Sequence, residues 1–206
     1  MTVYVSGAVE GIIDEAVFGR LVQHAKAEVG PIHRTEGKGR LLARLNGFNH
    51  AARHAPWFVL VDLNGDADCA PSFVHEHLPS PAPRMAFRVA VRAIEAWLLA
   101  DRERMAAWLD VPLQQVPGVP DTEADPKAAL INLARRSRSW EVRADLVPRE
   151  GSGRKAGPLY PSRLIEFVQG ERHGWRPAVA ARTSDSLRRC LRHLRNLATP
   201  IRGGPA

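Results

Sequence analysis

Short apolar runs alternate with segments of helical periodicity in the first part of the chain. Strand-like runs occupy Thr2–Val5, Ile32–Thr35 and Trp57–Val61. Apolar residues three or four positions apart predict helices between them, at 14–29 and 40–54. Because strands that alternate with helices pair into parallel sheets with helices on both faces, this pattern predicts an α/β fold.

The pattern changes after the third strand. One more strand is expected at Met85–Val91, which brings the predicted sheet to about four strands. We expect helices at 71–78, 93–110, 125–136 and 162–168. A last helix is expected after these, capped by Thr183 or Ser184. The segment 111–125 is expected to be a loop, and Ser137–Pro161 a flexible polar loop. The predicted organisation is an α/β core at 1–110 and a mainly helical, basic extension at 111–206 that packs on this core.

Composition limits the class of protein. The chain has 206 residues, and no apolar stretch is long enough to span a bilayer. It starts with a strand pattern and not with a signal peptide. Its two cysteines, Cys69 and Cys190, have no CxxC partner, which argues against a cysteine zinc site and predicts a reducing, cytoplasmic location.

The basic charge is uneven along the chain. The net charge is +7 and the pI about 10.2. Between Arg135 and Lys155 there are seven Arg and Lys residues and three acidic residues. Between Arg182 and Arg202 there are six Arg residues and one Asp. This excess indicates either a nucleic-acid partner or a solvated, arginine-rich surface that reflects coding bias.

An acidic turn follows the strand Trp57–Val61. Asp62, Asn64, Asp66 and Asp68 supply four oxygen-bearing side chains at the carboxyl end of this strand. Active sites of open α/β sheets lie at such ends, and Mg²⁺ binds one or two carboxylates together with water and phosphate oxygens. Asp62, Asn64 and Asp66 are therefore candidate metal ligands, while helix capping and a simple turn remain the alternative.

Two further acidic positions are candidates for the same site. Glu10 lies in the glycine-containing loop after the first strand and could complete a metal site or act on water. Asp14 and Glu15, close behind it, are expected to stabilise a helix N-terminus instead. Glu95 is expected to be at least partly buried, so it needs a partner, either an arginine such as Arg92 or a metal.

Basic residues offer candidates for phosphate contact. Lys155, in a loop with Arg149 and Arg154 that contains glycine and serine, is the strongest of them. Arg188, Arg192 and Arg195 recur on one side of the last helix, where a solvated surface is the simpler interpretation. The sequence lacks a GxxxxGK[ST] loop, an HExxH motif and a GxSxG motif, which argues against an ATPase, a zinc hydrolase and a serine hydrolase.

Several segments together resemble a bacterial domain-of-unknown-function family, number 4276, whose core is thought to be Toprim-like. The block Glu-Ala-Trp-Leu-Leu-Ala-Asp is the most specific of them. The matching segments span nearly the whole chain and are 3–7 with 14–17, 60–71, 93–101, 155–160, and 175–177 with 184–190.

This resemblance implies a function. Toprim-like domains bind Mg²⁺ through a glutamate after the first strand and an Asp-x-Asp pair after a later strand, and they occur in topoisomerases, primases and nucleases of the OLD kind. By this resemblance Asp62 matches the first aspartate, Asn64 stands at the second, and Ser6 stands at the glutamate, with Glu10 as a substitute. Relatives of this family are often linked to ABC-type ATPases in anti-phage systems.

Two functional hypotheses follow. The first is a Mg²⁺- or Mn²⁺-dependent nuclease in bacterial defence, in which Asp62, Asn64 and Asp66 hold the metal. Glu10 or Glu95 then completes the site or positions water, and Lys155 neutralises the phosphate. The alternative is a degenerate Toprim-like subunit that binds a nucleic acid or an ABC-type ATPase without catalysis, which the replacements at Ser6 and Asn64 favour.

Overall fold

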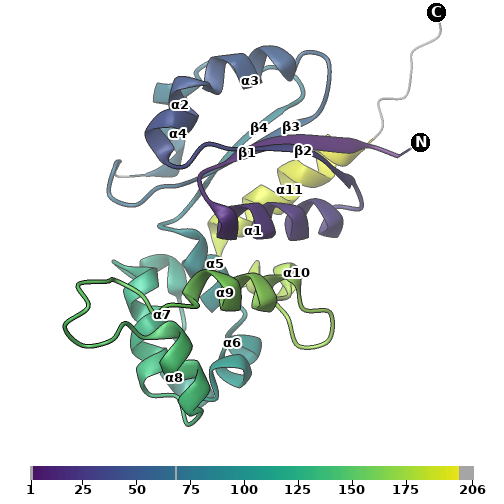
Figure 1. Cartoon of the computed structure of the whole chain (residues 1–206). Coiled ribbons are helices and arrows are strands. Elements are labelled where there is room, and N and C mark those ends of the chain that lie inside the picture. Colours follow the sequence, from purple (N-terminus) through teal and green to yellow (C-terminus); the bar gives the residue numbers. More distant parts are fainter. Residues whose placement is uncertain (1, 68, 200–206) are drawn as a thin grey trace, which may run out of the picture. The chain divides into compact units, whose positions relative to one another are not determined.

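The computed structural model describes residues 2–67 and 69–199 (Figure 1). Asp68 of the acidic turn and Arg202 of the C-terminal basic run lie outside the described residues. Backbone contacts divide the chain into two compact units. Among the described residues, the first unit takes in 2–61, 66–89 and 189–199, and the second takes in 62–65 and 90–188. The predicted boundary at residue 110 lies inside the second unit.

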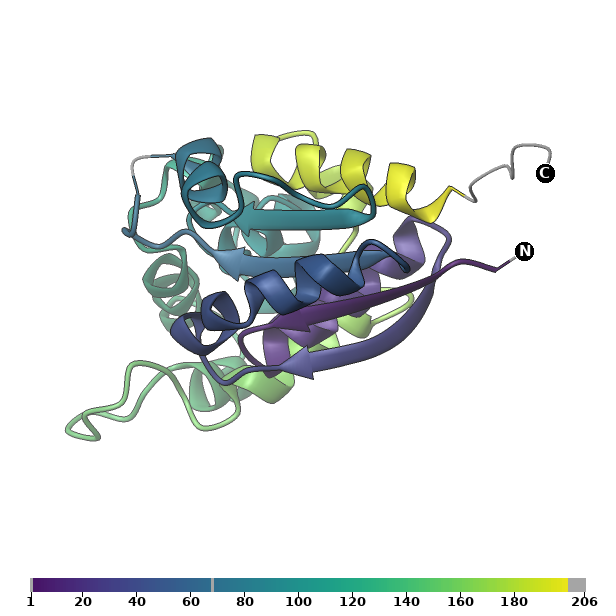
Figure 2. The ribbon, with the colours of Figure 1, turned by 90° about the horizontal axis from the view of Figure 1, so that it is seen from above.

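The sheet confirms the predicted α/β class. Its four strands are parallel and lie in the order β2-β1-β3-β4 (Figure 2). They are β1 (Tyr4–Val9), β2 (Glu28–Arg34), β3 (Trp57–Asp62) and β4 (Met85–Ala90). The connections that leave β1 and β3 run to opposite sides of the sheet. This order puts a topological switch point at the carboxyl ends of β1 and β3, where open α/β sheets bind ligands.

Helices cover both faces of this sheet, as predicted. Figure 1 shows α2 (Lys38–Ala43), α3 (Leu45–Ala51) and α4 (Ala70–His77) on one face. It shows α1 (Ile12–His24) and α11 (Asp185–Ala198) on the other. The sheet is therefore sandwiched between two helical layers, and this explains the continuous apolar run in β3, where 58–61 are fully buried.

Gly7 lies inside β1, beyond the predicted end of this strand at Val5. A Cβ at Gly7 would collide with the Phe18 ring and with the Phe58 carbonyl oxygen at 2.6 Å. Phe18 stacks on Phe58 with ring centroids 4.9 Å apart. The absence of a side chain at Gly7 therefore serves the packing of α1 on the sheet.

The second unit is helical. Its buried centre contains Trp97 and Trp175, both fully inaccessible, and Trp175 Nε1 donates a hydrogen bond of 3.0 Å to the Trp97 carbonyl. Its α-helices are α5 (Ile94–Leu99), α6 (Arg102–Leu109), α7 (Pro126–Arg135), α8 (Trp140–Leu146), α9 (Tyr160–Gln169) and α10 (Pro177–Ala180). Short 3-10 turns, η1 (Leu113–Gln115) and η2 (Pro120–Thr122), lie in the predicted loop 111–125. In the part of the chain that the structure describes, no helix combines the length and apolarity needed to cross a membrane.

The prediction of a flexible loop throughout Ser137–Pro161 is wrong, because α8 lies within it. Ser139 Oγ accepts a hydrogen bond from the Val142 backbone N–H at 3.3 Å and so caps this helix. Val142 and Leu146, one turn apart, are its buried residues. A pair of apolar positions is too short a periodic signal to stand out from a polar segment.

Candidate functional site

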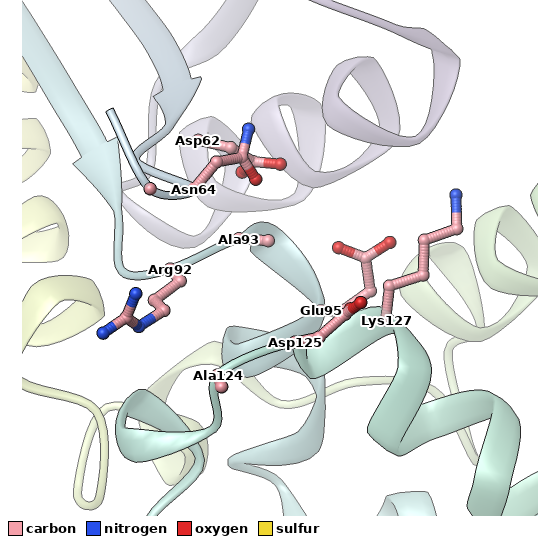
Figure 3. Close-up of a pocket in the computed structure, with 9 residues that line it drawn as sticks. Asp62, Asn64, Arg92, Ala93, Glu95, Ala124, Asp125 and Lys127 are labelled. Atoms are coloured by element: carbon pink, nitrogen blue, oxygen red, sulfur yellow. The ribbon is translucent and has the colours of Figure 1, made fainter. Parts of the chain in front are cut away.

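A pocket of about 440 Å³ lies in the second unit (Figure 3). Its volume is in the range of small-molecule and active-site clefts. Three stretches build it: the end of β3 with the turn after it, the start of α5, and the start of α7. The lining residues are Asp62, Asn64, Gly65, Arg92, Ala93, Glu95, Ala124, Asp125 and Lys127.

Backbone hydrogen bonds fix Asp62 at this pocket. Leu63 N donates to the Ala90 carbonyl at 2.9 Å, and Asn64 N donates to the Arg92 carbonyl at 2.7 Å. Asp62 Oδ1 accepts from the Ile94 backbone N–H at 2.9 Å. This bond anchors the half-buried Asp62 carboxylate at the start of α5 through one of its two oxygens.

Glu95 is buried, as predicted, with 6% of its surface exposed. The structure shows a tyrosine partner that was not among those expected: Tyr160 Oη donates to Glu95 Oε1 at 3.0 Å. Burial raises the pKa of Tyr160 far above its usual range, and the negative charge of Glu95 and their hydrogen bond raise it further. Tyr160 is therefore a neutral donor at working pH, and it holds the Glu95 carboxylate in place.

The start of α7 supplies two residues that were not predicted as site residues. Asp125 is the N-cap that the sequence predicts, and its Oδ1 accepts from the Ala128 N–H at 2.8 Å. Lys127 Nζ lies 4.9 Å from the centroid of the Tyr160 ring. Asp125 and Lys127 are far from Asp62 in the sequence, so no local spacing predicts that they share a site with it. The one feature that marks this segment is the carboxylate at an Asp-Pro helix start.

The pocket combines acids with cations. Figure 3 shows the Glu95 carboxylate pointing toward Asp62 and Asn64, with Lys127 beside it. Three carboxylates and two cationic side chains leave the lining with one net negative charge. Within the described residues, neither Arg92 nor Lys127 forms an ion pair. The pocket thus offers oxygen ligands for a cation and two positive groups for an anion.

This donor set fits Mg²⁺. No group of three or more His, Cys, Asp or Glu side chains arranged to hold a metal occurs among residues 2–67 and 69–199. Mg²⁺ needs fewer, because one or two carboxylates suffice when water and substrate oxygens complete its octahedron. Asp62 and Glu95, with the amide oxygen of Asn64, are of the hard oxygen type that this ion prefers.

Three of the predicted site residues do not line this pocket. Asp66 forms an ion pair with Lys38, with 2.5 Å between Asp66 Oδ2 and Lys38 Nζ. Glu10 lies in the bend after β1 and is half-buried. Lys155 is exposed in the connection between α8 and α9. Of the predicted set, the pocket therefore gathers Asp62, Asn64 and Glu95.

Of the two acids near Glu10, Asp14 has the predicted contact at the start of α1. Asp14 Oδ2 accepts from the Gly11 backbone N–H at 2.9 Å, so this carboxylate satisfies a free donor at the start of α1. Glu15 forms an ion pair with Arg34 at 3.1 Å. Both acids thus stabilise α1 and its surroundings.

A scan of protein-family models gives no match, and a search of curated proteins and solved structures finds no significant similarity to this chain. The resemblance to the Toprim-like family stays a prediction. The function of the pocket therefore has to be argued from its own residues.

Proposed function

We propose that the chain is a Mg²⁺-dependent enzyme that hydrolyses phosphodiester bonds of nucleic acid in this pocket. The observation that carries the proposal is the shared lining: Asp62, Asn64 and Glu95 face the same space as Arg92 and Lys127. Oxygen ligands for a divalent cation beside unpaired positive groups are what a metal-assisted phosphoryl-transfer site requires.

Asp62 and Asn64 are the proposed metal ligands. The Ile94 N–H donates to Asp62 Oδ1 and fixes the orientation of this carboxylate at the pocket. When bound there, Mg²⁺ or Mn²⁺ supplies Lewis-acid polarisation of a phosphoryl oxygen. Glu95, held by Tyr160, orients the attacking water through its second carboxylate oxygen.

Charge balance supports a phosphodiester substrate. The lining carries one net negative charge, so a divalent cation converts it to one net positive charge. A phosphodiester carries one negative charge and neutralises this remainder. Lys127 and Arg92 are the groups that contact its non-bridging oxygens.

The test is cleavage of single-stranded and duplex DNA and RNA by purified protein with Mg²⁺, with Mn²⁺ and with EDTA. We expect metal-dependent cleavage, and we expect Asp62→Asn to lower its rate by about 100-fold or more. Mutation of residues that only hydrogen-bond to metal ligands already lowers activity by about 10–100-fold. Asparagine keeps the acceptor for Ile94 and removes the charge. Asp66→Asn is the matched control, because that carboxylate pairs with Lys38 outside the pocket.

Two results contradict the proposal. The first is the absence of cleavage under either metal with every substrate. The second is an equal loss of activity in Asp62→Asn and Asp66→Asn, because a general effect of charge would then explain both.

A second candidate function is binding without catalysis, either to nucleic acid or to an ABC-type ATPase. The observation that favours it is Asn64, a neutral ligand in a pocket where a carboxylate would bind a cation more strongly. This function predicts no specific metal binding, which separates it from the enzyme.

A further inference from the structure

Trp140 is exposed to an unusual degree for its type. It is the first residue of α8, and 69% of its surface is accessible. Trp97 and Trp175 of the same unit are fully inaccessible. An exposed indole ring offers a free aromatic face on which a planar group can stack.

Three arginines lie directly before Trp140. Arg135 ends α7, and Arg136 and Arg138 lie in the turn that leads to α8. All three side chains are exposed and form no ion pair with any described residue. Glu141 is the only acid between Arg135 and Arg143. The local charge is therefore strongly positive.

The turn that carries these residues is held in shape. Ser139 caps α8 through the Val142 N–H, and Ser137 Oγ accepts from the Ser139 N–H at 3.0 Å. The Arg143 guanidinium donates to the Ser137 carbonyl. Val142 is buried and anchors α8 in the unit. Trp140 is thus presented from an ordered helix start, so little conformational freedom is lost when a ligand binds.

We infer that Trp140, Arg135, Arg136 and Arg138 form a binding surface for single-stranded nucleic acid, which we call the Trp140 surface. An unpaired base stacks on the indole ring, and the arginines contact the flanking phosphates. The inference rests on the proposed function for the identity of the polymer.

The single strand is favoured for a physical reason. In a duplex each base is covered by its neighbours, so only an unpaired base offers a free face for stacking on an aromatic ring. The residues before Trp140 are cationic, and this charge is complementary to the phosphates of a nucleic acid.

The test is a binding titration with fluorescently labelled oligothymidylate of about 16 nucleotides, the upper end of single-strand site sizes. EDTA is present, so no cleavage occurs. Trp140→Ala is expected to weaken binding by about 5-fold or more, the loss of one stacked base. Trp140→Tyr keeps a stacking ring and is expected to retain most of the affinity.

A duplex of equal length is the matched control. Trp140→Ala is expected to leave duplex affinity unchanged. The double variant Arg136→Gln/Arg138→Gln is expected to weaken binding of both polymers and to lower the salt dependence of that binding, because it removes phosphate contacts.

Equal single-strand affinity of wild type and Trp140→Ala overturns the inference, and so does an equal loss on single strand and duplex. Failure to bind either polymer also overturns it. The binding assay needs no catalysis. A chain that binds single strands through Trp140 but never cleaves them would therefore contradict the proposed function and leave this inference standing.

Discussion

In the second unit, the Asp101 carboxylate pairs with Arg176, whose side chain is 33% exposed. Asp101 is completely inaccessible, and its two oxygens accept from Arg176 Nη2 at 2.6 Å and from Arg176 Nε at 3.0 Å. The Arg176 backbone N–H donates a third bond, of 2.9 Å. A buried carboxylate with three charge-assisted or backbone donors is fully satisfied, so the loss of either partner is costly.

Asp101→Ala is expected to destabilise the fold by about 1–3 kcal/mol, because it leaves the Arg176 backbone N–H without its acceptor, whereas the partly exposed guanidinium stays hydrated and paired with Glu103. For a chain of this size the melting temperature falls by roughly 2–12 °C. Glu103→Ala is the control: Glu103 binds the same Arg176 at 2.9 Å but is 71% exposed, so its loss costs less than about 1 kcal/mol. Thermal unfolding of both variants checks this, and equal shifts would contradict it.

Asp121 is partly buried, and its ionised form destabilises the fold at neutral pH. Burial raises its pKa from the ordinary 3.8, and hydrogen bonds from Ser184 and Ser186 offset this only in part. Its Oδ1 is buried and has no hydrogen-bond partner among the described residues. Between 3.8 and the raised pKa the folded chain binds more protons than the unfolded chain. Stability therefore falls as pH rises through this window.

Asp121→Asn is expected to raise the melting temperature at pH 7 by roughly 1–2 °C, a small value because the group is partly solvated. The neutral amide keeps an acceptor for Ser184 and removes the buried charge. Below pH 3.8, where the wild-type carboxyl is neutral too, the two proteins should melt alike. A difference that stays constant over the whole pH range would contradict the assignment of the penalty to ionisation.

At the scale of elements, the packing of α1 on β1 depends on a missing side chain. Gly7→Ala is expected to destabilise the fold by about 1–3 kcal/mol, because the new methyl group collides with Phe18 and the Phe58 backbone. Gly19→Ala in α1 is the matched control: its Cβ would meet no atom within 4 Å. The gain in helix propensity should stabilise by about 0.5–1 kcal/mol. Urea unfolding measures both, and a loss in both would contradict the packing argument.

The strands and most helices could be predicted because their apolar periodicity is local. Phe58–Val61 is a continuous apolar run, and such a run indicates a central parallel strand whatever its neighbours are. The end of β1 was missed because Ser6, Gly7 and Ala8 are small and resemble a loop. Their place in the strand depends on pairing with Trp57, Phe58 and Val59 of β3, which are distant in the sequence.

Some residues of the candidate site could be predicted from local sequence patterns, and others could not. Asp62 and Asn64 lie at the end of a predicted strand, and Glu95 lies in a predicted helix. These three residues could therefore be identified from the sequence. Asp125 and Lys127 come from α7, and Tyr160 comes from α9. Only the folded second unit brings these three to Asp62 and Glu95, and no spacing within one element encodes that proximity.

At the scale of the whole molecule, charge has two opposite roles. The chain carries a net charge of +7, which attracts polyanions and speeds their association. The pocket lining instead carries one net negative charge, which attracts a cation. This combination of a basic chain and an acidic pocket is what the proposed function requires, a nucleic-acid substrate together with a divalent metal.

A calorimetric titration of the intact protein with Mn²⁺ tests the proposed metal site most directly. We expect one bound ion per chain, with an affinity that Asp62→Asn lowers by about 10-fold or more and Asp66→Asn leaves unchanged. The contrast depends on Asp62 lining the pocket while Asp66 pairs with Lys38. The absence of specific binding, or equal binding by wild type and Asp62→Asn, would contradict a metal-dependent enzyme and favour a protein that binds without catalysis.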